Sequence, residues 1–170
     1  LVDTAPDLVA TLNLMLADEG LPSLAMADAQ PLIGYGARRL IERGFEAAGV
    51  ALTEARTDEI FDRFIPHYMD HIADESRAFP GCVAALETLR AGGAKLAVCT
   101  NKRTDMSRLL LDALGMSPLF DAVMGPDEAG ARKPDPRHLA AAIAAAGGSL
   151  DRAIMVGDAA TDAGVAKAAG

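Results

Sequence analysis

Hydrophobic residues recur at helical spacing along the first part of the chain. Four of them share one face of an expected first helix: Leu8, Leu12, Met15 and Leu16. Gly20 is a natural end for that helix. The same spacing predicts helices over 27–33 and 37–48, and another that begins after the cap residue Thr53, with Pro66 as a break or kink. Short connections between such helices are typical of a small helical bundle.

The pattern changes near residue 78, where short apolar runs begin to alternate with helical segments. The runs that predict strands are 95–99 (KLAVC), 121–124 and 153–156. The segments that predict helices are 83–90, 105–114, 136–146 and the residues from about 161 onward. This alternation predicts an α/β fold with a doubly wound parallel sheet.

Length and composition limit the class of protein. A chain of 170 residues can form one domain, or a core with a small inserted module. No apolar run approaches the roughly 20 residues that a membrane helix needs. Cys82 and Cys99 are the two cysteines, so we expect no disulfide framework and a cytoplasmic location.

The net charge of −8 argues against nucleic acid as a partner, because phosphate backbones attract clustered Lys and Arg. There is no Trp, and aromatic residues make up 4% of the chain, so a platform for base stacking is not expected. A small anionic substrate needs only a local positive pocket and fits this charge. The pattern does not predict an oligomeric state.

Polar residues follow each predicted strand, and the carboxyl ends of strands are where α/β sheets bind ligands. Thr100, Asn101 and Lys102 come after the first strand and before a helix. A hydroxyl and backbone amides at such a junction suit a phosphate oxygen. An ordinary helix cap is the alternative interpretation.

Lys133 follows the second strand and is held by the residues around it. Pro134 biases Lys133 toward an extended backbone, Asp135 is a good helix cap, and Pro136 fits a first helical turn. An ammonium fixed near a helix start can neutralise a phosphoryl group. A solvated surface lysine is the alternative.

Asp158 and Asp162 follow the third predicted strand, four residues apart. Two carboxylates at the mouth of a buried strand would repel each other, and a bound Mg²⁺ would relieve that repulsion. Alternatively, Asp158 is a turn residue and Asp162 interacts with the dipole of the following helix.

Together the three loops resemble the second, third and fourth motifs of the haloacid dehalogenase superfamily, and the segments RKPDP and GDAATD are the most specific. The opening LVDTAPD is similar to the end of the family's first motif, which begins Asp-x-Asp-Gly-Thr. The resemblance implies an α/β core of the haloacid dehalogenase type (Rossmannoid), made of residues 1–5 and 78–170, with an inserted α-helical cap over 6–77.

The resemblance also implies roles for these residues. Thr100 would bind the phosphoryl group with Asn101 and Lys102, and Lys133 would stabilise charge. Asp158 would be the Mg²⁺ ligand, and Asp162 would support the metal's waters and Lys133. The nucleophilic and the acid–base aspartate would both lie before Leu1, on a central strand, and a chain that begins with Leu leads us to expect such an upstream segment.

Within the expected cap, residues 33–38 resemble the cap loop of phosphoglycolate phosphatases. Gly34 and Gly36 would let the backbone approach a small anion beside Tyr35, and Arg38 could pair with a carboxylate. A plain helix–helix turn with a surface arginine is the alternative interpretation.

The resemblance therefore predicts a Mg²⁺-dependent phosphatase that hydrolyses a small phosphate monoester, 2-phosphoglycolate, through an aspartyl-phosphate. Related activities share the same motifs: a sugar-phosphate phosphatase, a pyrophosphatase or a phosphoglucomutase. A haloacid dehalogenase proper would need no metal, and the paired Asp158 and Asp162 argue against it. A catalytically inactive binding protein on this fold is an alternative of a different class.

Overall fold

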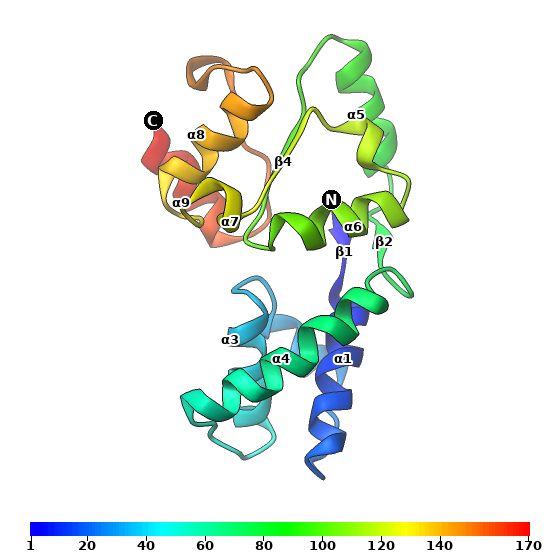
Figure 1. Ribbon diagram of the computed structural model, residues 1–170. Coiled ribbons are helices and arrows are strands. Elements are labelled where there is room, and N and C mark those ends of the chain that lie inside the picture. The colour runs from blue at the N-terminus through cyan, green and yellow to red at the C-terminus, as the bar shows by residue number, and fades with distance from the viewer. The chain divides into compact units, whose positions relative to one another are not determined.

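In the computed structural model, residues 1–170 form two compact units, Leu1–Phe79 and Pro80–Gly170. The first unit is mainly helical and contains α1 (Ala5–Asp18), α2 (Met26–Ala29), a 3₁₀ turn (Gln30–Leu32), α3 (Ala37–Ala47) and α4 (Glu54–Asp70) (Figure 1). The helices α1, α3 and α4 pack on one another. Their shared core is made of apolar side chains that are almost fully buried: Leu12, Leu16, Leu40, Ile41, Phe45, Ile60, Phe64 and Tyr68.

Two details of the helical unit differ from the sequence-based prediction. Thr53 caps α4 as expected, accepting a hydrogen bond from the Arg56 N–H at 3.3 Å, but α4 continues through Pro66 to Asp70. Residues 27–33 do not form one helix, because a short α-helix passes into a 3₁₀ turn that contains Pro31. The predicted helix over 37–48 is confirmed to within one residue.

Two short strands join the ends of this unit. β1 (Val2–Asp3) pairs antiparallel with β2 (Arg77–Ala78). Residues 1–5 lie within the first compact unit, Leu1–Phe79. Their assignment to the α/β core stays a prediction. Asp7, which is 3% exposed, accepts hydrogen bonds from the Glu75 N–H at 2.9 Å and from the Ser76 N–H and hydroxyl at 2.8 and 2.6 Å. These contacts tie the start of α1 to the segment before β2.

The second unit contains two strands, β3 (Ala97–Cys99) and β4 (Ala122–Met124). Its helices are α5 (Cys82–Ala91), α6 (Thr104–Ala113), α7 (Pro126–Ala129), α8 (Pro136–Ala145) and α9 (Ala160–Ala169), with 3₁₀ turns at Ser117–Leu119 and Leu150–Arg152. None of the helices in the structure has the length and apolar character needed to cross a lipid bilayer.

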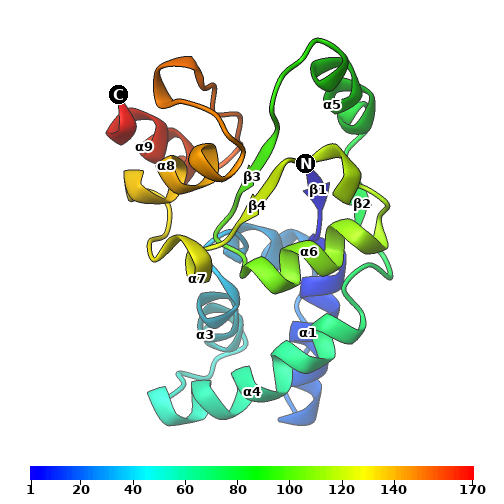
Figure 2. The same cartoon turned by 45° about the horizontal axis from the view of Figure 1, so that its top comes forward.

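The strands β3 and β4 are parallel, with Ala97, Val98 and Cys99 opposite Ala122, Val123 and Met124. In Figures 1 and 2, α8 and α9 lie on one side of this pair, and α5 and α6 lie on the other. A parallel sheet with helices on both sides is the arrangement of a doubly wound α/β fold. The predicted fold class is therefore confirmed.

Residues 153–156, predicted as a third strand, do not form one in the structure. Ala153 has an extended backbone, but no strand lies beside the segment. A strand is stabilised by hydrogen bonds to a neighbouring strand, and an apolar run alone does not provide them. Ile154 and Val156 are 90% and 86% exposed, so the expectation of a buried strand here is wrong for this structure.

Candidate active site

The first predicted site segment is a tight turn at the end of β3. The Thr100 N–H donates to the Met124 carbonyl at 3.1 Å, which continues the β3–β4 pairing by one residue. The Lys102 N–H then donates to Thr100 Oγ1 at 3.1 Å, so the Thr100 hydroxyl closes the turn that leads into α6. Thr100, Asn101 and Lys102 are all half-buried. The turn is thus ordered by its own side chain, as is common for Ser and Thr in such positions.

The Asn101 side chain joins this turn to the Lys133 segment. Its amide group donates to the Lys133 carbonyl at 3.2 Å, and its oxygen accepts from the Lys133 N–H at 2.9 Å. The two bonds imitate a backbone pairing between segments that are 32 residues apart. The expected help of the Asn101 amide in phosphoryl binding stays a prediction; in the structure the Asn101 side chain fixes the backbone of Lys133.

Lys133 lies where the strand ends meet. Its Nζ is 2.7 Å from the Cys99 carbonyl oxygen and 2.6 Å from Asp162 Oδ1, and only 10% of its side chain is exposed. The Lys133–Pro134 peptide bond is cis. As predicted, Asp135 caps α8 by accepting from the Arg137 N–H at 3.0 Å, and Pro136 occupies the first turn. The alternative of a solvated surface lysine is therefore wrong.

The segment after residue 156 supplies the carboxylate that holds Lys133. Asp162, with 8% of its side chain exposed, accepts hydrogen bonds from Lys133 Nζ and, through Oδ2, from the Ala159 N–H at 3.0 Å. Gly157 lies against this carboxylate: a Cβ built at Gly157 would stand 2.3 Å from Asp162 Oδ2. A side chain at position 157 is therefore excluded by packing. The sequence GDAATD requires its glycine for this reason.

Asp158 differs from Asp162 in being exposed, with no ion pair or hydrogen bond in the structure. No group of three or more His, Cys, Asp or Glu side chains is placed to hold a metal ion. Because Asp162 is already engaged by Lys133, the two aspartates do not form an unrelieved pair. Asp158 is thus the one free carboxylate of this segment, which fits Mg²⁺, since Mg²⁺ takes one or two carboxylates together with phosphate and water.

Burial and the Lys133 charge also act on the pKa values of two neighbouring groups. Burial raises the pKa of the Cys99 thiol; the Lys133 charge lowers it, and Asp162 raises it further. His138 of α8 is fully buried, and its Nε2 is 3.1 Å from the Met124 carbonyl oxygen while its Nδ1 has no partner. Burial lowers the pKa of His138, so the imidazole is held neutral.

The other four predicted site residues lie in the helical unit: Gly34, Tyr35 and Gly36 in the loop before α3, and Arg38 in the first turn of α3. Gly34 and Gly36 have φ of +103° and +95°, a backbone conformation that favours glycine. The Tyr35 ring lies 4.8 Å from the guanidinium carbon of Arg43. Arg38 forms an exposed ion pair with Asp58 of α4. The glycines therefore shape the loop, and Arg38 is already paired within its own unit.

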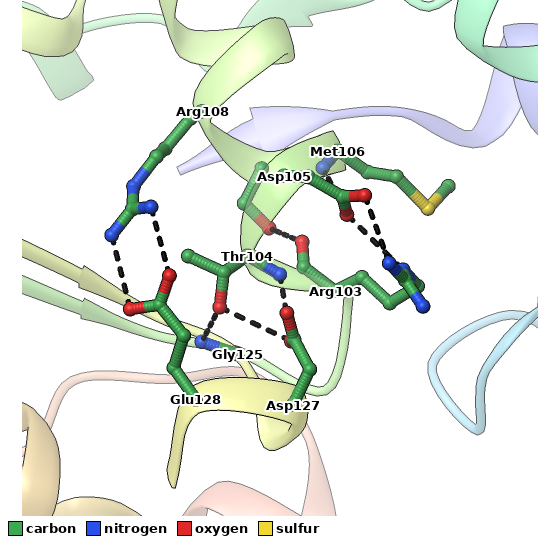
Figure 3. Close-up of polar contacts among 9 residues, drawn as sticks. Arg103, Thr104, Asp105, Met106, Arg108, Gly125, Asp127 and Glu128 are labelled. Atoms are coloured by element: carbon green, nitrogen blue, oxygen red, sulfur yellow. Dashed lines mark hydrogen bonds and ion pairs between the residues drawn. The ribbon is translucent and has the colours of Figure 1, made fainter.

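Sequence reasoning missed a polar group at the junction of β4 and α7. Thr104, Gly125 and Asp127 form a hydrogen-bonded cluster next to the Thr100 turn (Figure 3). The Gly125-Pro126-Asp127 sequence after an apolar strand is a signal for a strand end and a helix start. It gives no indication that Asp127 caps a different helix.

Comparisons with known proteins show the family to which the chain belongs. A family model described as haloacid dehalogenase-like hydrolase matches residues 1–170. The chain belongs to this family of hydrolases.

Within the family, the chain is similar to proteins named phosphoglycolate phosphatase. That of Caulobacter vibrioides is 54% identical over the whole chain, which covers 72% of the relative, and that of Mesorhizobium japonicum is 44% identical, with 75% covered. These relatives are phosphatases of phosphate monoesters, and the chain is an enzyme of that kind.

Solved structures agree on the fold. The crystal structure of a predicted phosphoglycolate phosphatase from Haemophilus somnus matches with a TM-score of 0.88 and 29% identity, covering 99% of the chain and 77% of that protein. A predicted phosphatase from Clostridium acetobutylicum matches with a TM-score of 0.78 at 20% identity, over 96% of the chain and 73% of that protein. At that identity the second likeness concerns the fold alone.

Proposed function

We propose that the protein hydrolyses 2-phosphoglycolate in a Mg²⁺-dependent reaction. The observation that carries this proposal is the convergence of the Thr100 turn and the Lys133–Asp162 pair at the strand ends of one parallel sheet. The carboxyl ends of parallel strands are where this fold class binds phosphorylated ligands. The 54% identity to the Caulobacter phosphoglycolate phosphatase supports the choice of substrate.

In this proposal the residues of the chain prepare the site for a phosphoryl group. Asp162 and the Cys99 carbonyl hold the Lys133 ammonium in one place, so that it faces developing negative charge without reorganising. The Thr100 and Lys102 N–H groups are bonded within the protein, so the Thr100 hydroxyl and the Asn101 N–H are the donors that we assign to phosphoryl oxygens. The attacking carboxylate, which would form an aspartyl-phosphate, and the acid–base carboxylate would come from the Asp-x-Asp-Gly-Thr motif, which does not occur in residues 1–170.

Asp158 is the residue of this chain that we assign to Mg²⁺, because its carboxylate is exposed and unpaired. When bound, Mg²⁺ would neutralise charge on the phosphoryl oxygens. Asp158→Asn should therefore lower activity by orders of magnitude without destabilising the fold. Asp151→Asn removes another exposed carboxylate, seven residues earlier, and serves as the control. Equal activity of the two variants, or wild-type activity that persists in excess chelator, would contradict the metal assignment.

We also propose that the cap loop selects the substrate and that the protein works in the cytoplasm. The positive φ values of Gly34 and Gly36 support close approach of the loop backbone to an anion. The location is supported by Cys82 and Cys99, which are both free thiols.

The test of the substrate is a panel of phosphate compounds offered to the full-length protein with Mg²⁺. The panel contains 2-phosphoglycolate, a sugar phosphate, an uncharged phosphate ester and pyrophosphate, and released phosphate is measured. We expect kcat/KM for 2-phosphoglycolate to exceed the others by at least about tenfold. A preference for pyrophosphate or a sugar phosphate would reassign the substrate, and no release from any compound would contradict the proposed activity.

A further inference from the structure

Thr104, the first residue of α6, is fixed by three hydrogen bonds to the junction between β4 and α7. Its N–H donates to Asp127 Oδ1 at 2.9 Å, and its hydroxyl donates to the same oxygen at 3.1 Å. The hydroxyl oxygen in turn accepts from the Gly125 N–H at 2.9 Å. Thr104 is 1% exposed, so all of its polar groups are satisfied inside the protein (Figure 3). The hydroxyl is thus oriented, with one donor bond and one acceptor bond.

Asp127 therefore caps a helix to which it does not belong. The residue before α6, Arg103, offers no side-chain cap, and the first N–H of the helix is taken by a carboxylate 23 residues further along the chain. Burial raises the pKa of Asp127, but hydrogen bonds from the Thr104 N–H, from its own N–H and from the Thr104 hydroxyl outweigh it, and the net pKa is lowered. Asp127 is thus ionised at neutral pH and can act as a cap.

Gly125 brings the two backbones into contact. A Cβ at Gly125 would stand 2.5 Å from the Thr104 nitrogen and 2.6 Å from the Lys102 carbonyl oxygen. These are backbone atoms that cannot rotate away as the end of a side chain could. The strand end and the turn therefore lie against each other along the stretch from Lys102 to Thr104.

The turn that we assign to phosphoryl binding is consequently held at both ends by one segment. At its start, the Thr100 N–H bonds to the Met124 carbonyl at 3.1 Å; at its end, Thr104 bonds to Gly125 and Asp127. A turn anchored only at its start could rotate its amides away from a phosphoryl group. Preorganised donors are what such a site requires.

We propose that Thr104 and Asp127 are positioning residues that hold the Thr100–Lys102 turn in the geometry that binds phosphate. This inference rests on the proposed function and adds two residues, neither of which contacts substrate. It differs from a role in stability alone because it predicts a change in affinity for phosphate itself.

The structure contains a matched control that joins the same two helices. Arg108 of α6 forms a two-pronged ion pair with Glu128 of α7, at 2.8 and 3.0 Å, about one helical turn beyond Thr104 (Figure 3). The side chains of this pair are 53% and 42% exposed, and they do not touch the turn. Arg108→Gln therefore weakens the contact between α6 and α7 and leaves the Thr100 turn anchored.

The experiment compares Thr104→Val, Thr104→Ser and Arg108→Gln in the full-length protein. Valine keeps the shape and removes the hydroxyl, which leaves the Gly125 N–H unpaired, while serine keeps the hydroxyl. The measurements are kcat and KM for 2-phosphoglycolate, the inhibition constant of inorganic phosphate, and Tm. We expect Thr104→Val to raise both KM and the inhibition constant by roughly tenfold, and Thr104→Ser and Arg108→Gln to leave both within about twofold of wild type.

The outcomes separate this inference from the proposed function. If the wild-type protein is active and Thr104→Val has the same inhibition constant for phosphate as the wild type, the positioning role alone is overturned. The positioning role is also overturned if Arg108→Gln, at the same loss of Tm, weakens phosphate inhibition as much as Thr104→Val does. A wild-type protein that neither hydrolyses 2-phosphoglycolate nor is inhibited by phosphate overturns the proposed function instead. If Thr104→Val does not fold, Asp127→Ala takes its place, because it removes the oxygen that accepts both Thr104 bonds, and the same increase in the inhibition constant is expected.

Discussion

Lys133 Nζ lies 2.6 Å from Asp162 Oδ1, and both side chains are about nine-tenths buried. This pair joins the loop between α7 and α8 to the start of α9. An ammonium in such a place needs its carboxylate, and the carboxylate needs the ammonium, because either charge alone would be poorly solvated. The Lys133–Asp162 ion pair is therefore expected to stabilise the fold as well as to form part of the candidate site.

The first prediction concerns the stability that this pair contributes. Lys133→Met leaves the Asp162 carboxylate buried without a counter-charge, and we expect the free energy of unfolding to fall by about 3 kcal/mol. Lys95→Met removes one partner of the Lys95–Asp121 pair, whose lysine side chain is 62% exposed, and should cost less than about 1 kcal/mol. Denaturant unfolding of both variants measures the difference. Equal losses would show that the burial of Lys133 carries no energetic weight.

A second prediction concerns Gly157. Gly157→Ala would place a Cβ 2.3 Å from Asp162 Oδ2 and push the carboxylate away from Lys133. We expect a loss of about 1–3 kcal/mol in stability, with a fall in turnover. Gly92→Ala is the control, because φ at Gly92 is −77° and the nearest atom to a new Cβ lies at 3.4 Å. Unfolding and phosphate release are measured for both variants, and the account fails here if Gly157→Ala is as well tolerated as Gly92→Ala.

The third prediction is that folding stability depends on pH through His138. Burial lowers its pKa, and the Lys133 charge adds to this, against opposing effects of the hydrogen bond to the Met124 carbonyl and of Asp127 and Asp135. Above the ordinary histidine pKa of about 6.5, both the folded and the unfolded chain are neutral at this residue. As the pH falls below that value, the unfolded chain binds a proton that the folded chain does not, so folding stability is lost.

His138→Gln removes this titration and should flatten the decline in unfolding free energy below pH of about 6.5, by up to ~1.4 kcal/mol per pH unit. His67→Gln, in α4 of the other unit, is the comparison. Urea unfolding between pH 5 and 8 measures the slopes. The assignment is wrong if His138→Gln and wild type lose stability in parallel.

The fourth prediction tests the cap loop. Arg38 pairs with Asp58 across two helices, whereas its neighbour Arg39 pairs with Glu42 within α3. If Arg38 exchanges Asp58 for a substrate carboxylate, Arg38→Ala should raise KM for 2-phosphoglycolate more than for an uncharged phosphate ester. Arg39→Ala should change neither value. Equal effects of Arg38→Ala on the two substrates would remove Arg38 from substrate selection.

The helices and the three polar loops could be predicted because their signals are local. The cap at Thr53, the Asp135-Pro136 helix start and the apolar spacing of α1 and α3 depend on neighbouring residues. Hydrogen bonds between residues far apart in the chain could not be predicted from the sequence. Asn101 bonds to the Lys133 backbone 32 residues away, and Asp127 caps α6 from 23 residues away. The strand predicted over residues 153–156 was wrong for the same reason, since a strand is stabilised by hydrogen bonds to a neighbouring strand.

The most direct test of the account measures the turnover of Lys133 variants in the full-length protein. Phosphate release from 2-phosphoglycolate is followed with saturating Mg²⁺ at a temperature where circular dichroism shows each variant folded. We predict that Lys133→Met lowers kcat by ~100-fold or more, because a fixed positive charge is lost from the site. Lys133→Arg should not restore it, because a planar guanidinium does not fit the place of a compact ammonium. Near-normal turnover in Lys133→Met would contradict the central claim that this strand-end centre binds the phosphoryl group.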